Sequence, residues 1–372
     1  MPKALKQNWI RNVREFDSAH AYAWTFLTKE EFKKLWATLD KHDTVIVDEA
    51  HHFAGTKSQL TKTLRAYLKK WKVPYRLFLT ATPYRSSPWD IYTLAKHLGY
   101  DWSWPQFDYL FFEDKYVGRG RKIRSPKPDI ENDIAALVAK IGDIVNIEDC
   151  ADIPEQVFDV ETFDLTKDQE KAKLNSYDAN TIVRFTHHHE IENGFLKGDG
   201  YVDDQFFTSN KEERIVELCE ETDKVIVVCR YHGQMAQLAS KLSALPKPVF
   251  QINGKVRDRH GVVLQAEEAK RAVVLVQAAC SEGYELPSFP LMIFASLDFS
   301  YVNYKQMLGR ILRLNKLKKN VYLHLVSKGI DAAVYSAIMN KKDFDLAIYA
   351  HEHSTQNTID EDPLLFGERF SD

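Results

Sequence analysis

The chain has 372 residues, of which 44% are hydrophobic and 28% are charged, and its formal net charge is −3. This length and balance are typical of a globular protein with two domains and connecting segments. The near-neutral charge excludes any argument for nucleic-acid binding from overall electrostatics, so such an argument must rest on local basic patches.

The four cysteines are scattered and form no C-x-x-C pair. Their spacing argues against a zinc ribbon and a disulfide framework and suits a reducing cytosol. No apolar run approaches the roughly 18 residues of a membrane-spanning helix, and the first residues do not resemble a signal peptide. We therefore expect a cytoplasmic protein or, if the protein is viral, one that is associated with the nucleoid or lies in the host cytoplasm.

Strand and helix patterns alternate through residues 1–100, which we assign to a first domain. Strands are predicted over 21–27, 44–50 and 75–83. Helices are predicted over 28–39, 58–71 and 87–98. Thr28 and Glu31 have the spacing of a capping box at the first of these helices. The alternation predicts a parallel sheet covered by helices, and the apolar run 44–50 predicts a strand buried on both faces.

Residues 101–205 break this alternation, and we interpret them as a connecting segment with helices of its own. A helix is predicted over 130–145. A strand that passes into a helix, with Thr166 and Gln169 as its capping pair, is predicted over 153–173. A polar, loop-rich stretch is predicted over 183–204. Its three histidines at 187–189 have no spaced fourth ligand, which favours a loop over a metal site.

The alternation returns in a second domain over 206–345, before a polar, acidic tail over 346–372. Helices are predicted over 209–221, 233–243, 304–314 and 331–342. Strands are predicted over 224–230, 248–254, 272–279, 290–296 and 320–327. The predicted fold class is therefore α/β, with two parallel-sheet domains.

The run "VIVDEAHHFAG" at residues 45–55 ends a predicted strand in two acids. Ligands of open parallel sheets bind beyond the carboxyl ends of the strands. Nucleotide hydrolysis needs a carboxylate that holds Mg²⁺ against the β- and γ-phosphates and a group that orients the attacking water. Asp48 suits the first role and Glu49 the second, while a pair of solvated acids at a strand end is the alternative.

The motifs around these acids resemble those of superfamily 2 helicases and translocases in their DEAH form. "VIVDEAHHF" resembles motif II, "LFLTATPYR" motif III, "VQAACSEGYELPSF" motif V and "QMLGRILR" motif VI. "MPKALKQNW" resembles motif Ia of the Swi/Snf-type and phage-type branch. The resemblance covers nearly the whole chain. It implies two RecA-like lobes, joined by a partly helical segment, that bind ATP and Mg²⁺ between them.

The resemblance also implies roles for single residues at the nucleotide. Arg310 and Arg313 lie three apart on a predicted helix and would contact the γ-phosphate as arginine fingers, with a basic helix face as the alternative. Gln306 belongs to the same motif. Gly283 and Glu285 would lie near the ribose, although Glu285 replaces the commoner Asp or Asn. His51 would couple the ATP site to motif III, with a structural histidine as the alternative.

A motor of this class tracks the phosphate backbone, because its movement must be indifferent to sequence. Thr80 and Thr82 would link the ATP state to the grip on nucleic acid. Further candidate contacts are Lys3, Arg230 and the basic patch Arg119, Arg121, Lys122 and Arg124. Aromatic residues precede this patch and can stack on bases, while packing against the first domain is the alternative. DNA is the preferred partner.

No G-x-x-x-x-G-K-[ST] phosphate-binding loop occurs in the sequence. In this family the loop precedes motif Ia, and the chain opens at motif Ia, so we expect the strand, loop and helix of that segment to be missing. The chain is then a fragment of a longer helicase, or another chain supplies the loop, or ATP hydrolysis has been lost. The first sheet should be incomplete, with an open edge and exposed apolar groups.

Two functions remain open. The first is an ATP-dependent DNA helicase or translocase, of which this chain would be the C-terminal portion. The compact layout of its motifs points to a phage or mobile-element origin. The second is a relative that binds nucleic acid or a partner without hydrolysing ATP. An RNA helicase is a weaker third. Retention of the two acids and both arginines favours the first, because an inactive protein has no physical need for all four.

Overall fold

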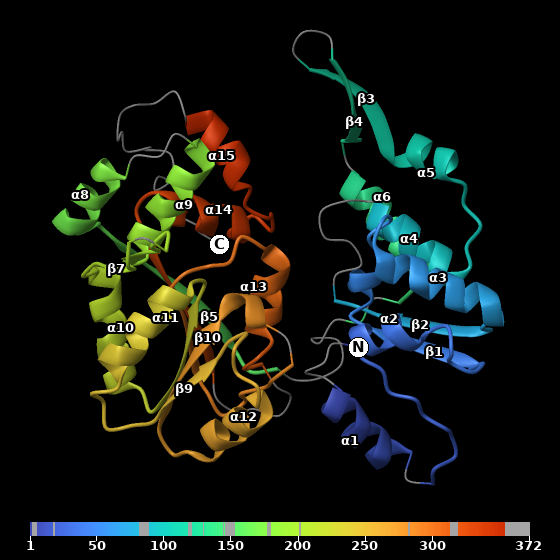
Figure 1. Ribbon diagram of the computed structural model, residues 1–372, viewed down its shortest axis with the longest axis horizontal. Helices are drawn as coiled ribbons and strands as arrows, with labels where there is room; N and C mark the ends of the chain where they lie inside the picture. Colours follow the sequence, from blue (N-terminus) through green and yellow to red (C-terminus); the bar gives the residue numbers. More distant parts are fainter. Residues whose placement is uncertain are drawn as a thin grey trace. The chain divides into compact units, whose positions relative to one another are not determined.

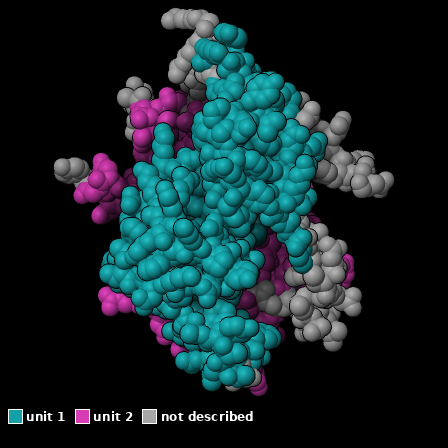
Figure 2. Space-filling model, turned by 90° about the vertical axis from the view of Figure 1, so that its right-hand side faces the viewer, with its two compact units in different colours: residues 1–150 teal, residues 151–372 magenta. Residues whose placement is uncertain are grey.

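The computed structural model describes residues 1, 6–17, 19–81, 89–117, 121–128, 130–143, 145, 153–176, 180–200, 202–281, 283–312 and 319–353. The chain divides into two compact units, Met1–Cys150 and Ala151–Asp372 (Figures 1 and 2). The division falls inside the segment that the sequence pattern treats as connecting. None of the described helices is both long enough and apolar enough to cross a membrane.

Unit 1 is built on a two-stranded parallel sheet, β1 (Thr44–Asp48) and β2 (Tyr75–Leu79), in which Asp48 lies opposite Leu79. Its helices are α1 (Lys6–Phe16), α2 (Lys29–Leu35), the short 3-10 helix η2 (Ala50–Phe53), α3 (Gln59–Trp71), α4 (Trp89–Leu98), α5 (Trp104–Phe111) and α6 (Ile130–Ile141). An antiparallel ribbon of β3 (Phe112–Val117) and β4 (Arg121–Pro126) extends from the end of α5 (Figure 1).

Two apolar clusters hold unit 1 together. One joins Val47 of β1 to Leu64 and Leu68 of α3, and the other joins α4, α5 and α6 through residues that include Phe107 and Ile134. Both clusters are formed by residues at helical spacing on one face of each helix, which is the pattern of surface helices that cover a core.

The capping box that the sequence predicts at α2 is confirmed. The Thr28 hydroxyl accepts from the backbone N–H of Glu31 at 3.2 Å, and the Glu31 carboxylate accepts from the N–H of Thr28 at 2.7 Å. The prediction of a strand over 21–27 is wrong, because this extended stretch pairs with no described strand; the Trp24 ring stacks on Phe26 instead. The prediction that the first-domain strand is buried on both faces is also wrong, since only Val47 of β1 is buried.

Unit 2 contains a six-stranded parallel sheet in the order β5-β12-β11-β8-β10-β9. Its strands are β5 (Gln156–Phe163), β8 (Lys224–Cys229), β9 (Val249–Ile252), β10 (Ala272–Gln277), β11 (Leu291–Phe294) and β12 (Asn320–Ser327). A small antiparallel pair consists of β6 (Phe195–Leu196) and β7 (Gln205–Phe206). The helices are α8 (Lys167–Asn175), α9 (Thr181–Glu192), α10 (Asn210–Glu221), α11 (His232–Leu242), α12 (Arg259–Glu268), η4 (Ala278–Cys280), α13 (Tyr301–Leu308), α14 (Ile330–Met339) and α15 (Leu346–His353).

Both faces of the unit 2 sheet are covered. Along β8, Ile226 and Val228 pack into one cluster with α12, α13 and α14, whereas Val225 and Val227 pack into another with α10 and α11. Successive side chains of a strand point to opposite faces, so a strand covered on both sides reads as a continuous apolar run, as "VIVVC" does. The α/β fold with a parallel sheet is therefore confirmed for this unit.

Three predictions for unit 2 need correction. Residues 181–192 form helix α9, capped by the Asn180 side chain at the N–H of Ile182, and not a loop. The strand predicted near 156–163 is an edge strand of the six-stranded sheet, and so belongs to unit 2. The helix predicted over 304–314 ends at Leu308, because Gly309 is its C-cap and glycine is a poor helix former.

A buried polar network ties α9, α10 and α14 together. Lys211 Nζ donates to Asp331 Oδ2 and to Asn193 Oδ1, both at 2.8 Å. His189 Nε2 lies 3.3 Å from the other Asp331 oxygen, and its Nδ1 lies 2.6 Å from the hydroxyl of Tyr231. Burial alone would raise the pKa of Asp331, but the Lys211 ammonium and His189 outweigh it and hold that pKa well below its ordinary value.

Candidate functional site

The carboxyl end of β1 presents the two acids that the sequence singles out. Glu49 follows the strand with φ +51° and ψ 52°, a left-handed conformation that is uncommon for a residue other than glycine. This conformation ends the strand abruptly and starts η2 at the next residue. The turn therefore sets Asp48 on the strand end and Glu49 on the helix cap, next to each other.

Asp48 keeps the capacity to bind a cation. Its Oδ2 accepts from the indole Nε1 of Trp9 at 2.8 Å, and its Oδ1 accepts from the N–H of Glu49 at 3.0 Å. A carboxylate oxygen has two lone pairs, so each of these oxygens can accept one hydrogen bond and still ligate a metal. Trp9 is a partner that the sequence did not reveal, because nothing local connects residues 39 apart.

His51 connects the ends of the two strands. It is 3% exposed, and its Nδ1 lies 3.1 Å from the Thr80 hydroxyl, which follows β2, and 3.2 Å from Glu49 Oε2. That Glu49 oxygen is buried beside the His51 ring. The structure thus brings together Glu49, His51 and Thr80, three residues that the motifs predict to act together.

An open cavity of 780 Å³ lies beside β1, a volume within the range of small-ligand sites. Its wall includes every residue of β1, with Asp48 at the end, and the segment 22–29. No residue of β2 lines it, so the cavity lies on the side of β1 away from its partner strand. Among the described residues β1 pairs with β2 alone, and the expected open edge of the first sheet is observed.

In unit 2 the arginine of motif VI is held in place by backbone carbonyl groups. Arg310 Nε donates to the carbonyl of Gln306 at 3.0 Å, and Nη1 donates to the carbonyl of Tyr284 at 2.8 Å, with the guanidinium 5.7 Å from the Tyr284 ring. Arg310 lies in the turn after α13, whereas the sequence placed it within the helix. The interactions with Gln306 and Tyr284 orient the side chain without a helical backbone.

The motif V residues lie against the same arginine. Gly283 has φ +87°, a conformation that favours glycine, and Glu285 two residues later is exposed. Gln306 is 9% exposed and its Oε1 accepts from the Ser281 hydroxyl at 2.9 Å, while its Nε2 is buried without a hydrogen-bond partner among the described residues. Motifs V and VI therefore form one assembly beyond the carboxyl end of β10.

Arg230 follows β8 and is held within unit 2. It forms an ion pair with Asp298, its guanidinium stacks 3.6 Å from the centroid of the Phe299 ring, and its N–H donates to the Ser296 hydroxyl at 2.8 Å. Asp298 and Phe299 come just after β11, so they lie at the same sheet edge. The sequence did hold a signal for this ion pair, because an arginine and an acid that follow neighbouring parallel strands meet at the same edge of the sheet.

The remaining predicted contacts with nucleic acid are only partly placed. Lys3 and Thr82, like the second motif VI arginine Arg313, lie outside the described residues. Arg121 begins β4, but its side chain is not described. Lys122 is exposed on β4 and pairs with Asp114 of β3 at 2.7 Å.

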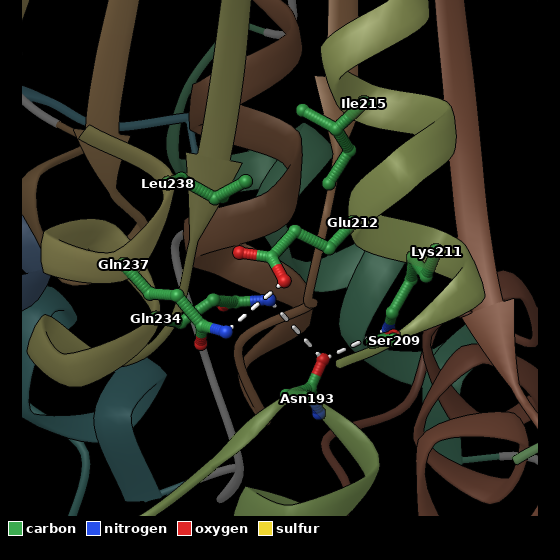
Figure 3. Close-up of a pocket in the computed structure, with 8 residues that line it drawn as sticks. All are labelled: Asn193, Ser209, Lys211, Glu212, Ile215, Gln234, Gln237 and Leu238. Atoms are coloured by element: carbon green, nitrogen blue, oxygen red, sulfur yellow. Dashed lines mark hydrogen bonds between the residues drawn. The ribbon is translucent and has the colours of Figure 1, made fainter. Parts of the chain in front are cut away.

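A second cavity lies among the buried polar residues of unit 2 (Figure 3). Its volume is about 10 Å³, which has room for one water molecule and excludes a nucleotide. Glu212 Oε1 is buried there without a partner among the described residues, and burial raises the pKa of this carboxyl. The described residues hold no group of three or more side chains that could bind a metal, and His189 is committed to the network with Asp331.

Two family models match this chain. The SNF2-related domain matches residues 3–206, and the helicase conserved C-terminal domain matches residues 210–315. The chain belongs to the SNF2-related family. It is thus a superfamily 2 protein of the Swi/Snf-like type with a RecA-like α/β fold, as its motifs predict. No curated protein matches the sequence.

Solved structures of this class are similar to the chain at low identity. The C-terminal part of the Fun30 ATPase domain is 12% identical, with a TM-score of 0.43, over 54% of this chain and 96% of that one. The Hef helicase domain of Pyrococcus furiosus is 14% identical, with a TM-score of 0.45, over 83% and 77%. The SWI2/SNF2 ATPase core of Sulfolobus solfataricus in complex with dsDNA is 14% identical, with a TM-score of 0.37, over 95% and 83%.

Proposed function

We propose that this chain is part of an ATP-dependent motor that moves along DNA. The observation that carries the proposal is the arrangement at the end of β1. There Glu49, which follows Asp48, lies beside His51, and His51 in turn lies beside Thr80 at the end of β2. Such a motor needs a hydrolytic site that communicates with the nucleic-acid grip, and this set of contacts supplies a physical route between motifs II and III.

The residues of unit 1 fit ATP and Mg²⁺ in part. Asp48 retains lone pairs for a cation, and the Glu49 carboxylate, beside His51, is suited to accept a proton from a water molecule. When bound, Mg²⁺ would neutralise charge on the β- and γ-phosphates. In this proposal Arg310 and Arg313 act as arginine fingers, and Gly283, Glu285 and Gln306 shape the nucleotide environment.

We further propose that the phosphate-binding loop is supplied by polypeptide other than residues 1–372. The sequence has no loop of that kind, and β1 offers an open edge beside a 780 Å³ cavity with Asp48 on its wall. A strand that pairs with this edge would end next to Asp48, and parallel strands that end together place their following loops side by side. The loop N–H groups and its lysine would then cradle the phosphates.

The second candidate, a relative that binds DNA or a partner without hydrolysing ATP, has one observation in its favour. The indole of Trp9 donates to Asp48 Oδ2 at 2.8 Å and so occupies one of the lone pairs of this carboxylate. In this alternative the interaction of Trp9 with Asp48 is structural, and the acids keep the turn after β1 in place. A phage or mobile-element origin and a cytoplasmic location are proposals compatible with either candidate.

The test supplies the missing loop and removes the water-orienting acid. The strand, phosphate loop and helix of an SNF2-related ATPase are fused ahead of residue 1, and phosphate release is measured with and without DNA. Glu49→Gln should lower DNA-stimulated turnover by about 10²- to 10⁴-fold, the usual contribution of a positioned base. Glu30→Gln, an exposed acid on α2, is the matched control and should leave turnover unchanged. Equal rates for the two variants would reject the hydrolytic role.

A further inference from the structure

The ribbon of β3 and β4 carries a surface that the motifs do not explain. Directly opposite residues of an antiparallel pair share a face, so Tyr116 and Lys122 lie on one face of the ribbon together with Asp114 and Arg124. Arg124 forms ion pairs with Asp114 at 3.0 Å and with Asp108 of α5. Arg124 therefore anchors the ribbon to α5.

The aromatic residues around this ribbon fall into two groups. Phe107, Phe111 and Phe112 are buried in the cluster with α4 and α6, as the packing alternative predicts. Tyr109 and Tyr116 are 75% and 71% exposed. Single exposed aromatic residues are common, so exposure alone decides nothing.

Each exposed tyrosine has a lysine beside it. Lys122 lies directly opposite Tyr116. Lys127 Nζ lies 5.5 Å from the centre of the Tyr109 ring and donates to the Tyr109 carbonyl at 2.9 Å. An aromatic ring next to an ammonium group is the combination that binds a base and its phosphate together.

The ribbon also has a surplus of positive charge, although the whole chain is negative. Residues 108–127 contain six basic and three acidic side chains. Two of the acids, Asp108 and Asp114, are already paired within the ribbon and α5. Lys115 lies on the face of β3 opposite Tyr116, where it is exposed and pairs with no acid in the described part of the chain, and it adds to the positive charge of the ribbon as a whole. The surplus is therefore available to a polyanion.

We propose that this ribbon surface, made of Tyr109, Tyr116, Lys122 and Lys127, binds single-stranded nucleic acid. The bases stack on the two tyrosines and the lysines contact the phosphates. In a duplex the faces of the bases are covered by their neighbours, so only an unpaired strand can offer them to a side-chain ring. The inference rests on the proposed function and assigns it a substrate class, the unpaired strand.

The test measures binding of the full chain to a fluorescently labelled single-stranded oligonucleotide and to the duplex of the same sequence. Tyr109→Ala and Tyr116→Ala should each weaken single-strand binding about 5- to 100-fold, the usual effect of losing one stacked base. Tyr116→Phe keeps the ring and should bind as the wild type does. Tyr75→Ala on β2 removes a tyrosine that is 68% exposed and should change nothing.

The charge contribution is tested separately by salt dependence. Lys127→Gln should reduce the slope of log affinity against log salt by about 0.7, the value for one phosphate contact with a single strand. If the wild-type chain binds neither oligonucleotide, the proposed function and this inference are both rejected. Binding that Tyr109→Ala and Tyr116→Ala leave intact, or a clear preference of the ribbon for duplex, would reject the inference alone.

Discussion

Replacement of Lys211 by methionine should destabilise unit 2 strongly. Lys211 is 2% exposed, and its ammonium donates to Asp331 and Asn193, so the replacement leaves a buried carboxylate without its cation. Removal of one partner of a buried ion pair costs about 3–5 kcal/mol. That is a large share of the roughly 5–15 kcal/mol that stabilises a typical domain.

The pH of the measurement follows from the pKa of Asp331. The folded pKa lies below the unfolded one, so the stability from this group is present above the unfolded pKa and is lost as the pH falls through the folded value. The full effect of Lys211→Met should therefore appear at pH 7. With a urea m-value of about 2–3 kcal/mol/M, the unfolding midpoint of unit 2 should fall by roughly 1–2.5 M.

The chain offers an internal reference for this assay. All seven tryptophans lie in the first 104 residues, so tryptophan fluorescence reports on unit 1 alone. Circular dichroism also follows unit 2. The midpoint from circular dichroism should shift, while the fluorescence transition stays in place. Lys211→Met combined with Asp331→Leu should be less destabilised than the sum of the single variants, because both charges are then gone. A shift below about 0.3 M for Lys211→Met would refute this role of the network.

Three further variants test other parts of the account. Trp9→Phe removes the indole donor to Asp48 and should lower the free energy of unfolding of unit 1 by about 1–2 kcal/mol. Fluorescence of the remaining tryptophans measures this loss, and no change would show that the hydrogen bond does not stabilise unit 1. Burial lowers the pKa of His324 to about 4, so the unfolded state takes up protons first and the stability of unit 2 falls as the pH drops from about 6.5 to about 4. His324→Phe should flatten this dependence of stability on pH, and an unchanged dependence would contradict the assignment. Gly329→Ala places a Cβ against the buried Glu192 carboxylate at φ +111° and should lower the free energy of unfolding by about 2–4 kcal/mol. Gly200→Ala, which also has a positive φ but open space around it, should lower it less. Equal losses for the two variants, measured by urea unfolding, would exclude the clash.

Local signals in the sequence located much of the fold. The caps at Thr28 and Thr166, each with its partner three residues later, mark α2 and α8 correctly, because a capping box is a local arrangement. The continuous apolar runs of unit 2 mark the strands of its sheet. The stretch 21–27 is also rich in apolar residues but is not a strand, because strand formation depends on a partner that composition does not reveal.

Other elements depended on contacts between distant residues. Helix α9 contains three consecutive histidines, and its stability comes from burial of His189 against Tyr231 and Asp331. The ribbon of β3 and β4 was missed because its residues are charged and lack an apolar alternation.

The candidate site likewise combines residues that short motifs single out with contacts between distant residues that no motif reveals. The motifs single out Asp48, Glu49, His51 and Arg310 as candidates, because each motif is a short stretch of sequence. The links that organise them, from Trp9 to Asp48 and from His51 to the end of β2, join residues far apart in the chain. Arg310 was expected within a helix, yet it is oriented by two carbonyl groups in a turn.

The most direct test of the central claim compares DNA-stimulated ATP hydrolysis by this chain alone and by the chain with a phosphate-binding loop fused ahead of residue 1. The account predicts no DNA-stimulated turnover by residues 1–372 alone, and turnover by the fused protein that Glu49→Gln abolishes. Turnover by the chain alone that the same substitution abolishes would contradict the proposal that the loop comes from other polypeptide. A fused protein that binds ATP and DNA yet never hydrolyses the nucleotide would contradict the assignment of a motor.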